Sequence, residues 1–234
     1  MAIYITGDIH GDMSIRKLGR SSFEEGRSLT RDDYVIILGD FGLVWDGRES
    51  DEWWLDWLEA CPWTTLFIDG NHENHPLLAT YPARGYMGGM VHEVRPHVLH
   101  LMRGWVFDLP ADGGTRSFLA MGGAASHDRE WRTEGVSWWP EEVPDEEERS
   151  LCERSLSERG WRVDHVLTHD APSDLVPKLG ILSGRNFAAD DYERWLNSVS
   201  FRLDFGRWWF GHFHIDRELS GGFAALYNNV VRAD

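Results

Sequence analysis

Residues 34–40 read Tyr-Val-Ile-Ile-Leu-Gly-Asp, an apolar run that ends in a glycine and an acid. The same pattern occurs on both sides of it. Residues 2–6 lead into Gly-Asp-Ile-His, and residues 64–68 lead into Asp-Gly-Asn-His. Short apolar runs bounded by Gly and Asp are typical of buried strands. Repeated in this way, they predict an α/β fold with a largely parallel sheet, whose ligands collect beyond the carboxyl ends of the strands.

Two longer stretches have the spacing and end signals of helices. Residues 51–60 carry acids in their first turn, and residues 144–159 open with Pro and acids and place Leu151 and Leu156 inward. Residues 13–20 are also compatible with a helix. After Pro76 the apolar runs become shorter, which predicts an antiparallel or mixed second half. The further runs expected to form strands are residues 91–94, 98–101, 105–109, 117–121, 163–168 and 208–210.

The composition excludes several classes of protein. Acidic residues outnumber basic ones by 39 to 23, for a net charge of −16, and the basic residues are scattered along the chain. Proteins that bind extended nucleic acid normally carry a basic patch, so neither DNA nor RNA is expected as a partner. No apolar run approaches the roughly 18 residues of a membrane helix, and residues 1–12 become polar too early for a secretory signal. We therefore expect a soluble, cytoplasmic protein with no membrane partner.

The chain shows no internal repeat and no long Pro-, Gly- or Ser-rich linker, which predicts one domain over residues 1–234. Its hydrophobic fraction of 42 %, including 13 Trp, is ample for a buried core. The two cysteines, Cys61 and Cys152, are expected to be reduced thiols, since no secretion signal precedes them. The sequence leaves the oligomeric state open.

Five polar turns, each directly after an apolar run, contain side chains that bind metals. They lie at residues 8–10, 39–40, 70–72, 168–169 and 211–214, and they read Asp-Ile-His, Gly-Asp, Gly-Asn-His, Thr-His and Gly-His-Phe-His. Carboxylate and imidazole suit Mn, Fe or Zn, and the lack of thiolates argues against a structural zinc site. Two catalytic ions about 3.5–4 Å apart need a bridging carboxylate and terminal ligands for each ion, and these turns supply both.

In this order, from Gly7 to His214, the motifs resemble those of the calcineurin-like metallophosphoesterase superfamily. Residues 122–124 and 137–142 further resemble a bacterial and bacteriophage branch, which implies the cytoplasm of a bacterium or of a phage-infected host cell. The resemblance implies an α/β fold of the four-layer α/β/β/α sandwich type, with mixed sheets and the active site at the carboxyl ends of the strands. It also implies a dinuclear-metal-dependent phosphoric ester hydrolase.

The resemblance assigns ligands to two divalent ions: Asp8, His10 and His214 for the first, Asn71, His169 and His212 for the second, and Asp40 as the bridge. Mn²⁺ is the favoured metal, and Fe, Zn, Ni or Mg would also fit. If the turn that holds His212 and His214 is extended, both side chains point the same way and face one cleft.

His72 follows Asn71, and we assign it, with Asp40, to the catalytic residues. It would contact the substrate phosphate or protonate the leaving group. Many superfamily members orient this histidine with an Asp three residues after the bridging one, where this chain has Leu43. The acids that could take over this role are Asp46, Asp69 and Glu73.

The arginine that follows that Asp in the phosphoprotein phosphatases is also absent, because residues 41–45 are apolar. Guanidinium is a natural partner for a terminal dianionic phosphate, so its loss favours diesters. We expect a phosphodiesterase that cleaves small nucleotide diesters such as 2′,3′-cyclic nucleotides through a metal-bridging hydroxide. Asn71, His72 and Arg129 are the expected substrate contacts, although residues 127–129 could equally form a salt-bridged loop.

Two alternatives remain open at this stage. One is a phosphomonoesterase or phosphoprotein phosphatase. The other is a catalytically inactive binding scaffold of the same fold, which is disfavoured because every expected ligand is present.

Overall fold

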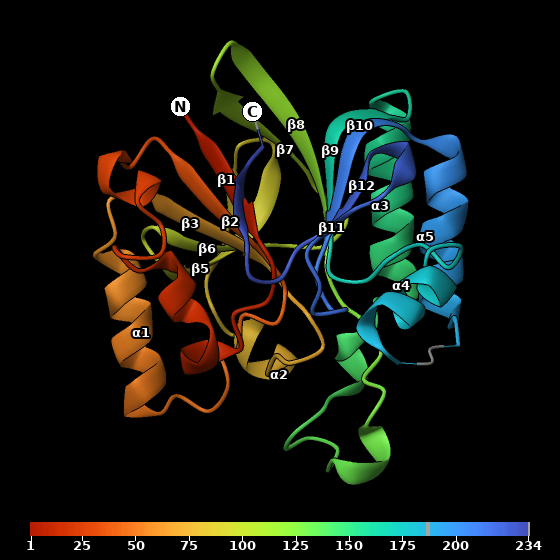
Figure 1. Cartoon of the computed structure of the whole chain (residues 1–234), viewed down its shortest axis with the longest axis horizontal. Helices are drawn as coiled ribbons and strands as arrows, with labels where there is room; N and C mark the ends of the chain where they lie inside the picture. Colours follow the sequence, from red (N-terminus) through yellow and green to blue (C-terminus); the bar gives the residue numbers. More distant parts are fainter. Residues whose placement is uncertain (186–187, 234) are drawn as a thin grey trace.

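The computed structural model describes residues 1–185 and 188–233, which form two β-sheets flanked by helices (Figure 1). The larger sheet has the strand order β13-β1-β2-β3-β6-β5-β4. Its strands are β1 (Ile3–Thr6), β2 (Tyr34–Leu38), β3 (Thr64–Ile68), β4 (Ala83–Tyr86), β5 (Gly89–Arg95), β6 (Val98–Leu101) and β13 (Val230–Arg232). β1, β2, β3 and β6 are parallel, β13 pairs antiparallel with β1 and β5 with β6, and β4 pairs antiparallel with β5 at the edge.

The smaller sheet has the order β11-β12-β10-β9-β8-β7. Its strands are β7 (Val106–Ala111), β8 (Gly114–Met121), β9 (Arg162–Thr168), β10 (Asp204–Phe210), β11 (Arg217–Glu218) and β12 (Phe223–Ala225). β8, β9, β10 and β12 run parallel, and β7 and β11 pair antiparallel at the two edges. Both sheets are therefore mixed, and the α/β class expected from the sequence is confirmed.

The two sheets share one hydrophobic core. Alternate side chains such as Ile36 on β2 and Leu167 on β9 belong to the same buried cluster, because the residues of a strand point by turns to its two faces. The other face of the larger sheet packs against α1 (Glu49–Glu59), through Leu55 and Leu58. Burial of both faces explains why these strands read as continuous apolar runs.

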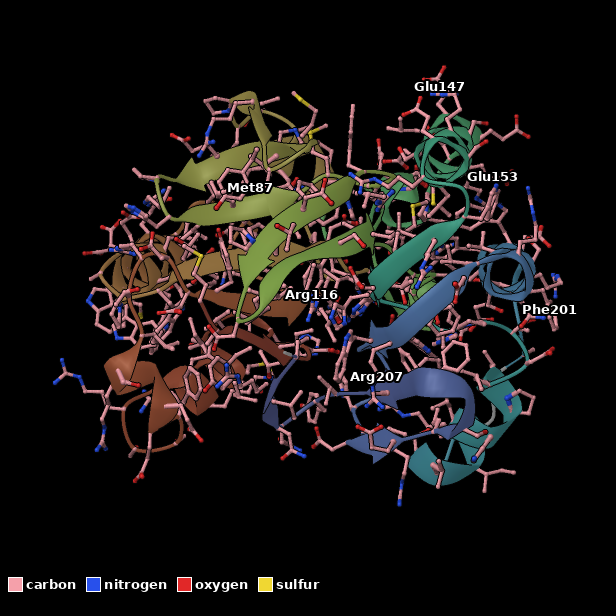
Figure 2. The ribbon with its side chains drawn as sticks, turned by 90° about the horizontal axis from the view of Figure 1, so that it is seen from above. Met87, Arg116, Glu147, Glu153, Phe201 and Arg207 are labelled. Carbon is pink, nitrogen blue, oxygen red and sulfur yellow. The ribbon has the colours of Figure 1, made fainter. Side chains whose placement is uncertain are left out.

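Three helices pack on the other face of the smaller sheet: α3 (Glu146–Glu158), α4 (Val176–Ser183) and α5 (Asp191–Arg202). Seen from above, Glu147 and Glu153 of α3 and Phe201 of α5 point away from the strands (Figure 2). A short helix, α2 (His75–Leu78), follows β3. Across the described ranges, each helix is too short or too polar to cross a membrane.

The structure differs from the prediction made from the sequence at several elements. Residues 13–20 do not form an α-helix, since the chain there makes two 3₁₀ turns, Gly11–Met13 and Ile15–Leu18. Helix α5 was not foreseen, although Asp190 and Glu193 form a capping box at its start. In α3, Leu156 is buried as expected, but Leu151 is only partly covered. Cys61 and Cys152 are free and lie in different buried clusters.

Candidate metal centre

Four ligating side chains gather beyond the carboxyl ends of β1, β2 and β10. Asp8, His10, Asp40 and His214 each direct one ligand atom into a group in which all four atoms lie within 4.8 Å of one another. Nε2 of His214 is 3.2 Å from Oδ2 of Asp8 and 3.0 Å from Nε2 of His10. Nε2 of His10 lies 3.7 Å from Oδ2 of Asp8 and 3.7 Å from Oδ2 of Asp40. We call these four residues the first ligand group.

Asp8 shows that this group suits a cation. Its Oδ1 accepts a hydrogen bond from the backbone N–H of His212 at 3.1 Å, whereas its buried Oδ2 has no hydrogen-bond partner among the described residues. A buried carboxylate oxygen without a partner is costly unless a charge satisfies it. A divalent ion bound by Oδ2 of Asp8 and the two imidazole nitrogens would do so.

A second ligand group lies on the other side of Asp40. Nε2 of His169 is 3.3 Å from Oδ1 of Asp40 and 3.2 Å from Oδ1 of Asn71. The opposite nitrogen of His169, Nδ1, donates to the carbonyl of Leu38 at 2.7 Å, which leaves the lone pair of Nε2 free to bind a metal. Nδ2 of Asn71 donates to Oγ of Ser126 at 3.1 Å and so fixes the direction of its Oδ1.

Asp40 thus offers Oδ2 to the first ligand group and Oδ1 to the second. Both groups lie beside one carboxylate, which is the arrangement needed for a bridging ligand between two ions. The strand order explains why Asp8, Asp40 and Asn71 lie together, because β1, β2 and β3 are parallel neighbours and the turns that follow them meet at one edge.

His212 lies beside the second group, with its ring centre 5.0 Å from that of His169. The turn is not extended, so the condition for both side chains to point the same way is not met: His212 and His214 both have left-handed backbones, with φ of 63° and 53°. His214 therefore reaches the first group while His212 stands next to the second. Nε2 of His212 is 3.3 Å from Nε2 of His127, which belongs to the stretch 127–129 that the sequence offered as a possible part of the cleft.

The backbone of the site is tightly shaped. His10 and Asp40 are also left-handed, with φ of 46° and 45°, a conformation that non-glycine residues adopt mostly where the surroundings impose it. Glycines let the chain pass against the carboxylates. A Cβ on Gly70 would lie 2.2 Å from Oδ1 of Asp40, and one on Gly211 would lie 2.3 Å from Oδ1 of Asp8. The Gly residues of the sequence motifs are therefore part of the ligand geometry.

The electrostatics of the second group also call for a cation. Burial raises the pKa of Asp40, but the adjacent His169 outweighs it and holds the pKa of this carboxyl well below its usual range. Burial lowers the pKa of His169, and Asp40 raises it to about 10. A positive charge is thus favoured between Nε2 of His169 and Asp40, and a divalent ion can supply it in place of a proton. Burial and His169 hold the pKa of His212 well below its usual range, which favours the neutral form that binds metals.

His72 lies at the same centre but is held differently. Its backbone N–H donates to Oδ1 of Asp40 at 2.7 Å, and its ring centre is 5.1 Å from that of His10. Nη2 of Arg132 lies 2.8 Å from Nε2 of His72. Besides His10, the imidazole of His72 therefore contacts an arginine from a distant part of the chain.

The three acids proposed to orient His72 have other partners. Asp46 pairs with Arg48, Asp69 pairs with Arg103 at 2.5 Å, and Glu73 accepts hydrogen bonds from the N–H groups of residues 41 and 42. These two hydrogen bonds to Glu73 hold the turn that follows Asp40 in place. Leu43, at the position of the missing Asp, is buried in the core.

Arg129 contacts Glu142 and lies over Trp138. Its Nε is 2.6 Å from Oε1 of Glu142, and its guanidinium carbon is 4.8 Å from the Trp138 ring centre. The substrate role assigned to Arg129 stays a prediction. Sequence reasoning missed Ser126 and Arg132. No local pattern could have found Arg132, since it lies 60 positions from His72 in a segment without regular spacing.

The comparisons with known proteins agree with this geometry. A search of curated proteins found no significant match. The sequence profile of the calcineurin-like phosphoesterases matches residues 1–216, which include both ligand groups and His72. The chain therefore belongs to the calcineurin-like phosphoesterase family and is a metal-dependent phosphoester hydrolase.

Proposed function

We propose that this protein is a phosphodiesterase that hydrolyses small nucleotide diesters, such as 2′,3′-cyclic nucleotides, with two divalent ions, of which Mn²⁺ is the favoured metal. The observation that carries the proposal is the position of Asp40, whose two carboxylate oxygens serve two groups of metal-ligating side chains. The unsatisfied Oδ2 of Asp8 supports it from the first group.

The roles of the ligands follow from their contacts. Asp8, His10 and His214 would hold one ion, and Asn71, His169 and His212 the other, with Asp40 between them. When bound, the two ions supply an activated water and neutralise charge on the phosphoryl oxygens. The protein keeps the ligands in place, for example through the hydrogen bond from His169 to Leu38.

His72 would act on the substrate rather than on an ion. Burial lowers the pKa of His72, so its imidazole is neutral near pH 7 and carries one ring N–H. That N–H can donate to an oxygen on phosphorus or to the leaving group. The backbone hydrogen bond to Asp40 sets the distance of His72 from the reacting centre.

The preference for diesters rests on the turn after Asp40. Phe41, Leu43 and Val44 are buried in the core, so this turn brings no guanidinium to the phosphate. A diester carries a single shared negative charge and depends less on such a group. The net charge of −16 further favours a small substrate that is bound mainly at the metal centre.

Phosphomonoesters are the second candidate class, because Arg132 places a guanidinium next to His72. An inactive scaffold has no comparable support, since the seven expected ligand positions all carry ligating side chains.

The test compares bis-p-nitrophenyl phosphate with p-nitrophenyl phosphate, using protein stripped with a chelator and reloaded with Mn²⁺. We expect metal-dependent cleavage of the diester, and a loss of at least ~100-fold in Asp40→Ala, which removes the shared ligand. Asp204→Ala is the matched control, because that carboxylate is exposed at the start of β10. Cleavage of the monoester alone would overturn the diester preference, and no metal-dependent cleavage of either compound would overturn the proposed activity.

A further inference from the structure

The chain between β8 and α3, residues 122–145, leaves the sheets and forms a projecting segment on the side of α2 (Figure 1). It contains two 3₁₀ turns, Arg129–Trp131 and Pro140–Glu142. The segment is tied to itself by Glu142, whose buried carboxylate accepts hydrogen bonds from the N–H and Oγ of Ser126, both at 2.7 Å. It is tied to the metal centre by the contact of Ser126 with Asn71.

Arg132 is the side chain of this segment that contacts His72. Its Nη2 is 2.8 Å from Nε2 and 3.4 Å from Nδ1 of the imidazole. Nε pairs with Asp128 at 2.8 Å, and Nη1 donates to the carbonyl of Ser137 at 3.3 Å. The side chain is only 13 % exposed. Arg132 is therefore held from both sides within the segment, with one edge of its guanidinium turned to His72.

The contact with His72 leaves the positive charge of the Arg132 guanidinium only partly neutralised. A guanidinium is always protonated and has five N–H donors, more than these contacts use. Its carboxylate partner, Asp128, is half exposed, and the remaining edge of the guanidinium faces an imidazole rather than a second carboxylate. An anion that reaches this edge would find a charge-assisted donor next to His72 and close to Asp40.

We propose that Arg132 is a substrate contact that binds a non-bridging oxygen of the phosphoryl group and so determines whether the site accepts terminal phosphates. On binding, that oxygen replaces Nε2 of His72 as the acceptor for Nη2 of Arg132. No bond other than these hydrogen bonds forms or breaks in this step. The proposal deepens the proposed function and rests on it.

The chemistry of the two ester classes gives Arg132 its selectivity. A phosphomonoester has three non-bridging oxygens, so one remains for Arg132 when two face the ions. A diester has only two, and its smaller charge is attracted less strongly by a guanidinium. Arg132 thus sets how well the site accepts terminal phosphates beside the diesters that it favours, and it does so from a part of the chain other than residues 41–45.

The experiment uses the Mn²⁺-loaded protein and the variants Arg132→Gln, Arg132→Lys and Arg194→Gln. Arg194 is the matched control, since it also pairs with one nearby acid, Asp191, at 2.7 Å, but lies at the exposed start of α5. We expect Arg132→Gln to lower kcat/KM for p-nitrophenyl phosphate on the order of 10- to 100-fold, as for loss of a hydrogen bond to a charged group. The loss for bis-p-nitrophenyl phosphate should be several-fold smaller, Arg132→Lys should recover part of it, and Arg194→Gln should match the wild type.

A second readout needs no turnover. Inorganic phosphate is titrated calorimetrically into each Mn²⁺-loaded variant, and Arg132→Gln should bind it on the order of 10-fold more weakly than the wild type. Equal phosphate affinity in wild type and Arg132→Gln would overturn the proposal, as would no binding to the wild type or an equal loss for both esters. If the wild type cleaves neither ester but phosphate binding still depends on Arg132, the proposed function fails and the phosphate contact stands.

Discussion

Asp40 shows how much of this site depends on single atoms. Its Oδ2 lies 3.7 Å from Nε2 of His10, its Oδ1 lies 3.3 Å from Nε2 of His169, and Oδ1 also accepts the backbone N–H of His72. Such a carboxylate can be shifted very little without loss of one ligand group. The residue types of the site could be predicted from the motifs. That Oδ2 of Asp40 faces the first ligand group and Oδ1 faces the second required the structure.

Substitution of Gly70 tests how far the Asp40 carboxylate can be shifted. In Gly70→Ala, the new Cβ would lie 2.2 Å from Oδ1 of Asp40 and 2.9 Å from Nε2 of His169, so both ligands must move. We expect Mn²⁺ affinity and metal-dependent activity to fall on the order of 10- to 100-fold. Calorimetric metal titration and ester hydrolysis measure these effects. Gly85→Ala is the control, because a Cβ there meets nothing within 4 Å, and wild-type metal affinity in Gly70→Ala would contradict the steric argument.

The elements that could be predicted from the sequence are those with an apolar run and a clear end. Residues 34–38, 64–68 and 98–101 form strands with the expected bounds. The helix expected at residues 13–20 does not form, because Gly19 falls within this short stretch and ends its 3₁₀ turn after Leu18. The projecting segment could not be predicted, since side chains such as Glu142 hold it together rather than any periodic pattern.

Glu142 accordingly sets the stability of that segment. Glu142→Ala would leave the N–H and Oγ of Ser126 and the guanidinium of Arg129 without their buried acceptor. We expect the free energy of unfolding to fall by about 1–3 kcal/mol. Because Ser126 also holds Asn71, kcat/KM should fall as well. Urea unfolding and limited proteolysis of residues 122–145 measure the change, with the exposed Glu141→Ala as control. Equal stability of the two variants would contradict this role.

At the scale of the whole molecule, the site exists because two sheets meet at one edge. Asp8, Asp40 and Asn71 follow strands of the larger sheet, whereas His169, His212 and His214 follow strands of the smaller one. The rule that ligands gather beyond the carboxyl ends of parallel strands predicted the common edge. It could not assign each strand to a sheet, because that depends on long-range pairing such as β1 with β13.

The buried His75 and the partly buried His92 give the molecule a pH-dependent stability. Burial lowers the pKa of His75 from 6.5 to about 3 and that of His92 to about 4. Below pH 6.5 the unfolded chain therefore binds protons that the native state does not, so stability is lost as the pH falls. Each such group contributes a slope of about 1.4 kcal/mol per pH unit between its two pKa values. His169, with a pKa raised to about 10, is protonated in the native state and largely protonated in the unfolded chain below pH 6, so it adds only a small slope of opposite sign there.

We expect urea unfolding of the metal-free protein to show a free energy that decreases between pH 6 and pH 5. The variant His75→Gln cannot take up that proton, so its slope should be smaller by about 1.4 kcal/mol per pH unit. The offset between the two proteins at pH 7.5 gives the cost of the substitution itself, because His75 is neutral there in both states. Subtracting this offset from the difference in unfolding free energy at lower pH leaves the part that comes from protonation of His75. Parallel curves for wild type and His75→Gln between pH 7.5 and pH 5 would show that His75 takes up its proton equally in the folded and unfolded chains, and the burial argument would then be wrong.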